Sequence, residues 1–227
     1  MAGTSALNRF YLLLLVLAVG GGGVLYWQTR GRGPSIPANV VVTVADTAGF
    51  SGYYLGDSAA PVRITEYADY ECPACQTFDV VQFPDVRRQL IETGKVRWRY
   101  RDFPLSIHPY SRVAAHSAAC ANDQGHYWEQ HTRLYQGQGQ WAREADPTGT
   151  FREYGKQIGL DLAAYDACMK SAKYAGRIQA SYDEGLKVGV ASTPTFLIAG
   201  RLYEGVQNSD ELKHLVDSLA AGDAASR

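Results

Sequence analysis

Two cysteines separated by two residues place the strongest constraint on the fold of this chain. Cys72 and Cys75 flank Pro73 and Ala74, directly after an alternating, β-branched segment and at the start of a helical one. At this spacing on the first turn of a helix, two cysteines can form a disulfide without large strain. Unpaired N–H groups at the helix start, together with the helix dipole, stabilise a thiolate and lower the pKa of Cys72. We therefore predict that Cys72 attacks and that Cys75, one turn further and facing inward, resolves.

The residues alone also allow two other functions for this cysteine pair, namely part of a zinc site or a purely structural disulfide. Half of a zinc site would need a second ligand pair. Cys120 and Cys168 are isolated, however, and of the five histidines only His116 lies at a short interval from a cysteine. We therefore expect no metal ion, and thiol chemistry needs no bound cofactor. A purely structural disulfide across three residues is more typical of secreted scaffolds than of an α/β domain.

The segments around the pair predict a strand–helix–strand unit. Val62–Tyr67 alternates along a β-branched strand pattern, and a helical segment runs from Pro73 to about Thr93. Lys95–Arg101 then alternates again as a second strand.

The remaining segments predict helices, then a hairpin, then a last helix. Helical patterns follow one another from about residue 108 to residue 188, while Thr195–Ile198 and Arg201–Tyr203 predict a hairpin around Gly200. An amphipathic helix closes the chain. We therefore predict an α/β domain over residues 53–222 with an all-helical insertion at about 108–188.

The N-terminus predicts export of this domain. Phe10–Trp27 is an uncharged run of 18 residues, and at about 1.5 Å per residue it reaches about 27 Å, enough to cross a bilayer. A cleaved signal peptide, with the small residues Ala18 and Gly20 at the cleavage site, remains an alternative. We predict that residues 1–28 form a membrane anchor or a signal sequence and that residues 29–52 form a flexible tether. The domain would then lie outside the cytoplasm, anchored to the membrane.

Composition excludes two classes of protein. The chain has 22 basic and 23 acidic residues and a formal net charge of −1, so no polyanion-binding surface is indicated and we expect no nucleic-acid partner. Its hydrophobic content of 46% supplies a core and excludes a mainly disordered chain.

Glu66 is a candidate proton carrier. It lies six residues before Cys72, and strand alternation places it on the face of Val62 and Ile64. A carboxyl group that points into a core has a raised pKa and can pass a proton to the resolving thiol. A glutamate that faces solvent at the strand end is the alternative.

A proline opens the late strand, between Thr193 and Thr195. Pro194 is consistent with a trans residue at a strand start. It is equally consistent with a cis peptide bond in a tight turn, and the pattern alone does not decide.

These motifs together resemble the DsbA-like members of the thioredoxin superfamily, close to the membrane-tethered thiol-disulfide oxidoreductases of bacteria. The resemblance extends from about Tyr53 to Leu219. The segments that carry it are Val62–Tyr67, Cys72-Pro73-Ala74-Cys75, Phe103-Pro104-Leu105, His108-Pro109, the alanine-rich segment through Cys120, Gly125 to His131, and Val190 to Phe196. It implies a thioredoxin fold with a helical insertion, preceded by one N-terminal transmembrane helix.

The resemblance also implies roles for individual residues. It makes Thr193–Pro194 a cis, substrate-binding element that faces the cysteine pair, and Glu66 matches the family's acidic residue. It further implies a second disulfide, between Cys120 and Cys168, for which two free buried cysteines are the alternative. One departure concerns Ala74, because the strongest oxidases have histidine there, which leaves the redox potential open.

We therefore predict a membrane-tethered, extracytoplasmic oxidoreductase that forms disulfides in exported proteins by dithiol–disulfide exchange. Its expected partners are exported client proteins that contain cysteines and a quinone-linked membrane re-oxidase, and we expect a monomer. A reductase or isomerase of the same fold is the nearest alternative. A non-catalytic, thiol-dependent metallochaperone or assembly factor is an alternative of another class.

Overall fold

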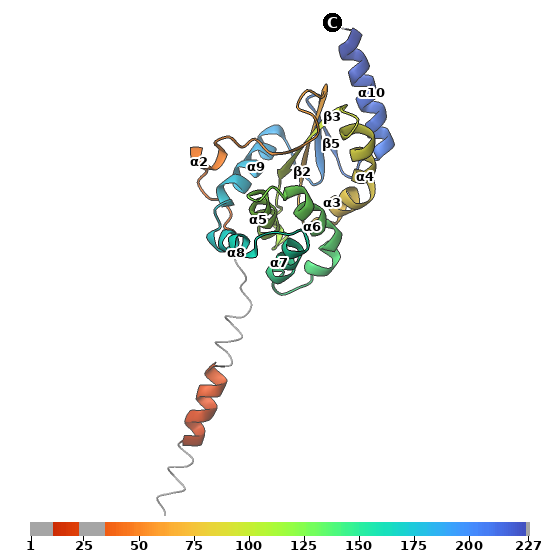
Figure 1. The fold of residues 1–227 in the computed structure, drawn as a ribbon. Helices are drawn as coiled ribbons and strands as arrows, with labels where there is room; N and C mark the ends of the chain where they lie inside the picture. The colour runs from red at the N-terminus through yellow and green to blue at the C-terminus, as the bar shows by residue number, and fades with distance from the viewer. Residues whose placement is uncertain (1–10, 23–34, 226–227) are drawn as a thin grey trace, which may run out of the picture. The chain divides into compact units, whose positions relative to one another are not determined.

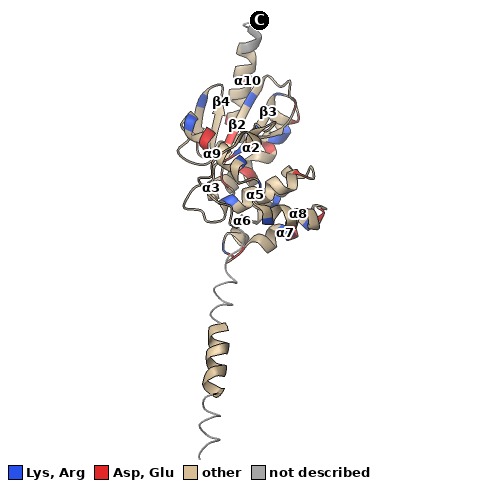
Figure 2. Cartoon of the chain, turned by 90° about the vertical axis from the view of Figure 1, so that its left-hand side faces the viewer, with Lys and Arg blue, Asp and Glu red and all other residues tan. Residues whose placement is uncertain are grey.

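The structure, a computed structural model, describes residues 11–22 and 35–225. The chain divides into two units, Met1–Gly33 and Pro34–Arg227. In the first unit, residues 11–22 form a helix (red in Figure 1) that contains no Lys, Arg, Asp or Glu and is therefore tan in Figure 2. No helix in the described ranges combines the length and apolar character that a membrane crossing needs. The predicted anchor Phe10–Trp27 extends past this helix at both ends, where its residues lie outside the described ranges.

A five-stranded sheet forms the centre of the second unit (Figure 1). Its strands are β1 (Tyr53–Leu55), β2 (Val62–Ala68), β3 (Val96–Asp102), β4 (Thr195–Ile198) and β5 (Arg201–Glu204), in the order β1-β3-β2-β4-β5. The β2 and β3 strands are parallel, as the predicted strand–helix–strand unit requires, and the other neighbouring pairs are antiparallel. The predicted hairpin around Gly200 is confirmed, and Gly200 adopts a φ of +78° that suits glycine in the turn.

The helical segment after β2 consists of four successive pieces. These are α3 (Pro73–Thr77), η1 (Phe78–Gln82), α4 (Phe83–Val86) and η2 (Arg87–Ile91), of which η1 and η2 are π-helical. The sequence predicted one continuous helix over this range. At the first junction the N–H of Phe83 donates to the carbonyl of Phe78, five residues back. Pro84 follows at once and has no N–H to donate, which accounts for the irregular hydrogen bonding there.

Helices cover both faces of the sheet (Figure 1). On one face, the segment from α3 to η2 and α10 (Ser209–Ala225) pack on buried side chains that include Ile64, Trp98 and Phe196. On the other face, α9 (Ala175–Val188) packs near Tyr67 and Phe103. The β2 strand is therefore covered on both sides, so its polar residues Thr65 and Glu66 are buried, while Arg63 near its start stays exposed.

The predicted all-helical insertion is present between β3 and β4. It consists of α5 (Ser111–Asn122), α6 (Tyr127–Trp141), α7 (Thr148–Gln157), α8 (Leu162–Ser171) and α9, of which the first four lie together (green to cyan in Figure 1). Small buried side chains such as Ala114 and Ala118 let α5 pack closely against its neighbours. The carboxylate of Asp161 caps α8 by accepting the N–H groups of Ala163 and Ala164 at 2.8 and 3.2 Å.

The segment before β1 differs from the flexible tether expected over residues 29–52. Residues 29–34 lie outside the described ranges, but from residue 35 onward the segment packs on the domain. Ile36 is buried, and the N–H of Asn39 donates to the side-chain carbonyl of Gln179 at 2.9 Å. A short helix, α2 (Val44–Thr47), lies against α9. This segment is held by contacts with residues about 140 positions away in the sequence. Its Gly and Pro content predicted a flexible tether because such distant contacts leave no local pattern.

Candidate active site

The two cysteines lie at the end of the central strand β2. A short loop after Ala68 leads to Cys72, which is the N-cap residue of α3, and Pro73 occupies the first turn. A proline fits there because the first N–H groups of a helix have no partner within it. Both thiols are free, and Cys72 keeps 6% of its surface exposed whereas Cys75 keeps none. Only Cys72 can therefore be reached by another molecule without a rearrangement.

The environment separates the acidities of the two thiols. Hydrogen bonding from the Cys75 thiol, from the Thr193 side chain and from the N–H groups of Cys75 and Ala74 lowers the pKa of Cys72 to about 5, against the opposing effect of burial. Burial, followed by the hydrogen bond to Cys72 and the charge of its thiolate, raises the pKa of Cys75 well above the usual range. One thiol is thus ionised at neutral pH, and the other keeps its proton.

In the reduced protein we expect the Cys72 thiol to titrate with a midpoint near pH 5. Because folding depresses this pKa, the thiolate stabilises the reduced protein fully only above the unfolded pKa of about 8.5, and this stabilisation is lost as the pH falls through the folded value. The measurement is the rate of thiol alkylation against pH. Cys72→Ala, which keeps Cys75, should show no such midpoint, and a wild-type midpoint above pH 8 would contradict the assignment.

The loop before β4 comes next to the exposed cysteine. The thiol of Cys72 donates to the carbonyl oxygen of Thr193 at 3.4 Å, across 121 residues of sequence. The Thr193–Pro194 peptide bond is cis, the conformation that the resemblance implied and that the strand pattern left open. The Thr193 hydroxyl is buried and has no other hydrogen-bond partner among the described residues, so it is free to donate to the Cys72 thiolate.

Glu66 lies inside the sheet, on the face that strand alternation predicted. It is 3% exposed, which rules out the solvent-facing alternative. The indole N–H of Trp98 donates to one carboxyl oxygen at 3.1 Å. Burial, and then the charge of Asp79, raise the pKa of Glu66 well above its usual range. The charge of Glu66 in turn raises the pKa of Cys75, because a carboxylate makes ionisation of a neighbouring thiol less favourable.

Asp69 is a site residue that the sequence analysis missed. Its backbone N–H donates to the sulfur of Cys75 at 3.5 Å. Its buried carboxylate accepts the N–H of Leu105 and Nδ1–H of His108, both at 2.8 Å, and the hydroxyl of Ser111. These bonds join the cysteine loop to the start of the insertion, and the bond to Asp69 raises the pKa of His108. The sequence feature that could have indicated Asp69 as a site residue is its position, directly after a buried strand and three residues before Cys72.

A glutamine of the insertion also holds the cysteine loop. The side-chain amide of Gln138, on α6, donates to the carbonyl oxygens of Tyr70 at 2.7 Å and of Cys72 at 2.9 Å. Nearby, His131 bridges Asp79 and the Tyr70 hydroxyl, with 2.8 Å to each. The sequence carried no signal for these contacts, because they join segments more than 50 residues apart.

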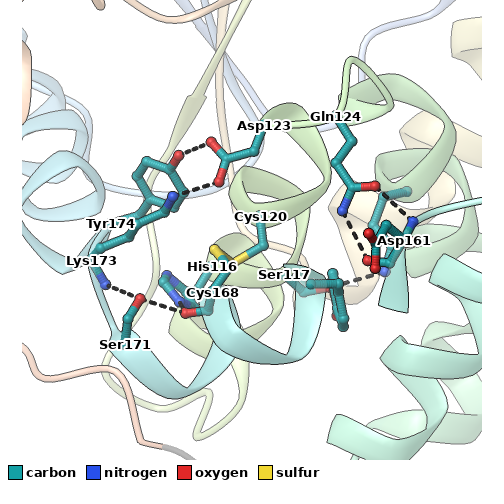
Figure 3. Close-up of a disulfide and its surroundings, with 12 residues drawn as sticks. His116, Ser117, Cys120, Asp123, Gln124, Asp161, Cys168, Ser171, Lys173 and Tyr174 are labelled. Carbon is teal, nitrogen blue, oxygen red and sulfur yellow. Dashed lines mark hydrogen bonds and ion pairs between the residues drawn. A yellow bond between two sulfur atoms is a disulfide. The ribbon is translucent and has the colours of Figure 1, made fainter. Parts of the chain in front are cut away.

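The remaining two cysteines form a disulfide. Cys120 on α5 and Cys168 on α8 are bonded, with their Cα atoms 5.7 Å apart (Figure 3). The structure thus separates the four cysteines into a free pair at the end of the sheet and a bonded pair within the insertion.

Comparisons with known proteins point to one family. A family model described as Thioredoxin matches residues 50–218. Curated relatives include the Na(+)/H(+) antiporter NhaA 1 of Salinispora arenicola, 37% identical over 168 residues that are 74% of this chain and 24% of that protein. They also include disulfide bond formation protein D of Bacillus subtilis, 23% identical over 172 residues that are 74% of this chain and 77% of that protein. The chain thus spans about a quarter of the length of the antiporter.

Solved structures show the same fold. The α-DsbA1 structure of Wolbachia pipientis has a TM-score of 0.69 at 22% identity and covers 78% of this chain and 94% of its own. Oxidised BdbD of Bacillus subtilis has a TM-score of 0.66 at 21% identity and covers 82% of this chain and 98% of its own. The predicted α/β fold of the domain is therefore confirmed.

Proposed function

The chain belongs to the thioredoxin family, in which it is DsbA-like, and from this premise we propose that it is an extracytoplasmic protein disulfide oxidoreductase that forms disulfides in exported proteins. The observation that carries the proposal is the asymmetry of the cysteine pair. The pKa of Cys72, at about 5, makes it a good leaving group, whereas Cys75 is buried and holds its proton. A disulfide whose reduced form is stabilised in this way oxidises other thiols readily.

The proposed reaction is dithiol–disulfide exchange through Cys72. A client thiolate attacks the Cys72 sulfur of the Cys72–Cys75 disulfide, the disulfide breaks, and Cys75 leaves and takes up a proton, which Glu66 can supply. A second client thiolate then attacks the client sulfur of the mixed disulfide and releases Cys72 as a thiolate. Two electrons and two protons have then left the client, whose two cysteines are joined.

The loop at Thr193–Pro194 is the proposed client-binding element. Its carbonyl group lies 3.4 Å from the Cys72 sulfur, and the Thr193 hydroxyl has no other partner among the described residues. A client segment bound along this loop would therefore present its cysteine to the exposed thiol. The reduced pair needs an electron acceptor, and we propose a quinone-linked protein in the membrane.

The reduction potential of the Cys72–Cys75 pair is the experiment that tests the proposed direction. We expect a value between about −120 and −270 mV, the ends set by the strongest oxidase and by thioredoxin. Ala74→His should make the protein more oxidising, because a histidine can add a positive charge and a hydrogen bond to the Cys72 thiolate. Each ~1.4 kcal/mol of added thiolate stabilisation raises the potential by about 30 mV.

Equilibration with glutathione buffers measures both proteins, and Ala74→Gln controls for side-chain size without a charge. A wild-type potential at or below −270 mV, the value of thioredoxin, would contradict the proposed oxidase and favour a reductase of the same fold.

We also propose that residues 1–28 carry the domain across the membrane and anchor it. The support is the uncharged run Phe10–Trp27, of which residues 11–22 are helical. An alkaline phosphatase reporter fused after Arg227 should be active, because this enzyme folds only where disulfides form, and it should stay in the membrane fraction after an alkaline wash. A fusion without residues 1–28 is the control and should be inactive. A full-length fusion that accumulates but is inactive would overturn export, and release by the wash would favour a cleaved signal sequence.

A further inference from the structure

A histidine lies against the disulfide of the insertion. His116 and Cys120 are one helical turn apart on α5, and Cys168 faces them from α8 (Figure 3). One ligand atom from each of the three residues lies within 4.8 Å of the other two, and all three residues are buried. This His116–Cys120–Cys168 cluster takes no part in the proposed exchange reaction.

The hydrogen bonding of His116 leaves one ring nitrogen free. Nε2 lies 3.1 Å from the carbonyl oxygen of Cys168, and since a carbonyl can only accept, we assign the ring proton to Nε2. Nδ1 therefore carries a lone pair. It is buried and has no hydrogen-bond partner among the described residues, whereas nearly all buried polar groups in proteins have one. A histidine with one N–H on a backbone carbonyl and the other nitrogen free has the arrangement typical of a metal ligand.

We propose that the reduced form of this cluster binds one zinc ion, through the sulfurs of Cys120 and Cys168 and Nδ1 of His116. Zinc prefers thiolate and imidazole ligands in a tetrahedral arrangement, and three protein ligands leave one position for water. At Zn–S bonds of about 2.3 Å the two sulfurs lie about 3.8 Å apart. Cα atoms 5.7 Å apart allow this by rotation of the side chains once the disulfide is broken.

Charge balance favours zinc at this buried place. Two thiolates neutralise one Zn²⁺ ion, so the loaded cluster would bury no net charge, which is the condition for burying ions without a large cost. The charged side chains that act on His116 are Lys173 and Asp123, which form an ion pair with each other at 2.6 Å (Figure 3) and so compensate each other. A monovalent cation would instead leave one negative charge uncompensated.

The redox step balances with a dithiol as the reductant. The Cys120–Cys168 bond breaks, the dithiol forms its own disulfide, and two electrons and two protons pass to the two sulfurs. Zinc then displaces these two protons to solvent. In the reverse direction, a disulfide takes two electrons from the thiolates, their S–S bond forms, and zinc is released. Zinc would thus hold α5 to α8 in a chain whose disulfide has not yet formed.

Metal stoichiometry tests the proposal on the full chain with Cys72→Ser and Cys75→Ser, which leaves Cys120 and Cys168 as its only cysteines. The protein is reduced with a phosphine under anaerobic conditions, mixed with Zn²⁺, separated by gel filtration and analysed for metal. We expect one zinc ion per reduced chain and none per oxidised chain. His116→Gln should weaken zinc binding at least about tenfold, since even residues that only support ligands have effects of this size. His126→Gln, outside the cluster, is the matched control and should change nothing.

Two further measurements, the absorption spectrum with Co²⁺ and near-ultraviolet circular dichroism, test the proposal even if the reduced chain is unstable. Co²⁺ in place of zinc should produce a thiolate charge-transfer band and the visible bands of a tetrahedral ion, and the visible bands should shift in His116→Gln. A reduced chain that has lost its near-ultraviolet dichroism should regain it with zinc. Failure to bind zinc, equal binding by the oxidised chain, or unchanged affinity in His116→Gln would each overturn the proposal.

Discussion

Cys75→Ala should accumulate covalent complexes with client proteins, whereas Cys72→Ala should accumulate none. Without the resolving thiol, a mixed disulfide at Cys72 cannot be released from within the protein, and the buried position of Cys75 leaves Cys72 as the reachable sulfur. The effect is close to all-or-none. The complexes should appear as high-mass bands on non-reducing gels of cells that express the variant, and they should disappear on reduction.

The control for this experiment is the variant with both substitutions, Cys72→Ala and Cys75→Ala. It should form no complexes, which excludes trapping through Cys120 or Cys168. Complexes that form with Cys72→Ala but not with Cys75→Ala would show that the roles of the two thiols are exchanged.

Replacement of Cys120 and Cys168 by serine should lower the free energy of unfolding by about 4 kcal/mol, the chain-entropy value for a closed loop of this length. The two cysteines are 48 residues apart and join two helices of the insertion. For a domain of this size, about 4 kcal/mol corresponds to a fall of about 8–16 °C in Tm. Thermal unfolding of the oxidised proteins in the presence of a metal chelator measures the difference.

The potential of the Cys72–Cys75 pair should hardly change in this variant, because the disulfide lies within the helical insertion. The double alanine variant is the matched control for two buried serine hydroxyls. An unchanged Tm, or peptide mapping that finds Cys120 and Cys168 as free thiols in the wild type, would refute a stabilising disulfide.

The local features of the active site could be predicted from the sequence. A strand followed by Cys72-Pro73-Ala74-Cys75 and a helix places the first thiol at the helix start, where backbone N–H groups lower its pKa. The structure places Cys72 as the N-cap of α3, and the pKa of Cys72 is lowered to about 5, the direction that the sequence predicted, with the largest contribution from the Cys75 thiol. The period of two in β2 likewise predicted the face on which Glu66 lies. Such features depend on residues within one or two turns of each other.

The contacts that complete the site could not be predicted in this way. The carbonyl of Thr193 reaches Cys72 from 121 residues away, and Gln138 holds the cysteine loop from another part of the chain. The carboxylate of Asp69 gathers a histidine, a serine and a backbone N–H from the segment after β3. Hydrogen bonds of this kind depend on the packing of the insertion on the sheet, which no local pattern records.

The sequence by itself therefore determined the positions of β2 to β5 along the chain, though not of β1, together with the cysteine pair at a helix start and the α/β class of the domain. These could be predicted because hydrophobic periodicity and helix-end chemistry act over short distances. Tertiary structure alone decided that residues from 35 to 52 pack on the domain, that Glu66 is sealed from water and that His116 lies beside the second disulfide. Burial and the pairing of polar groups are properties of segments brought together from far apart, and they exist only after the chain has folded.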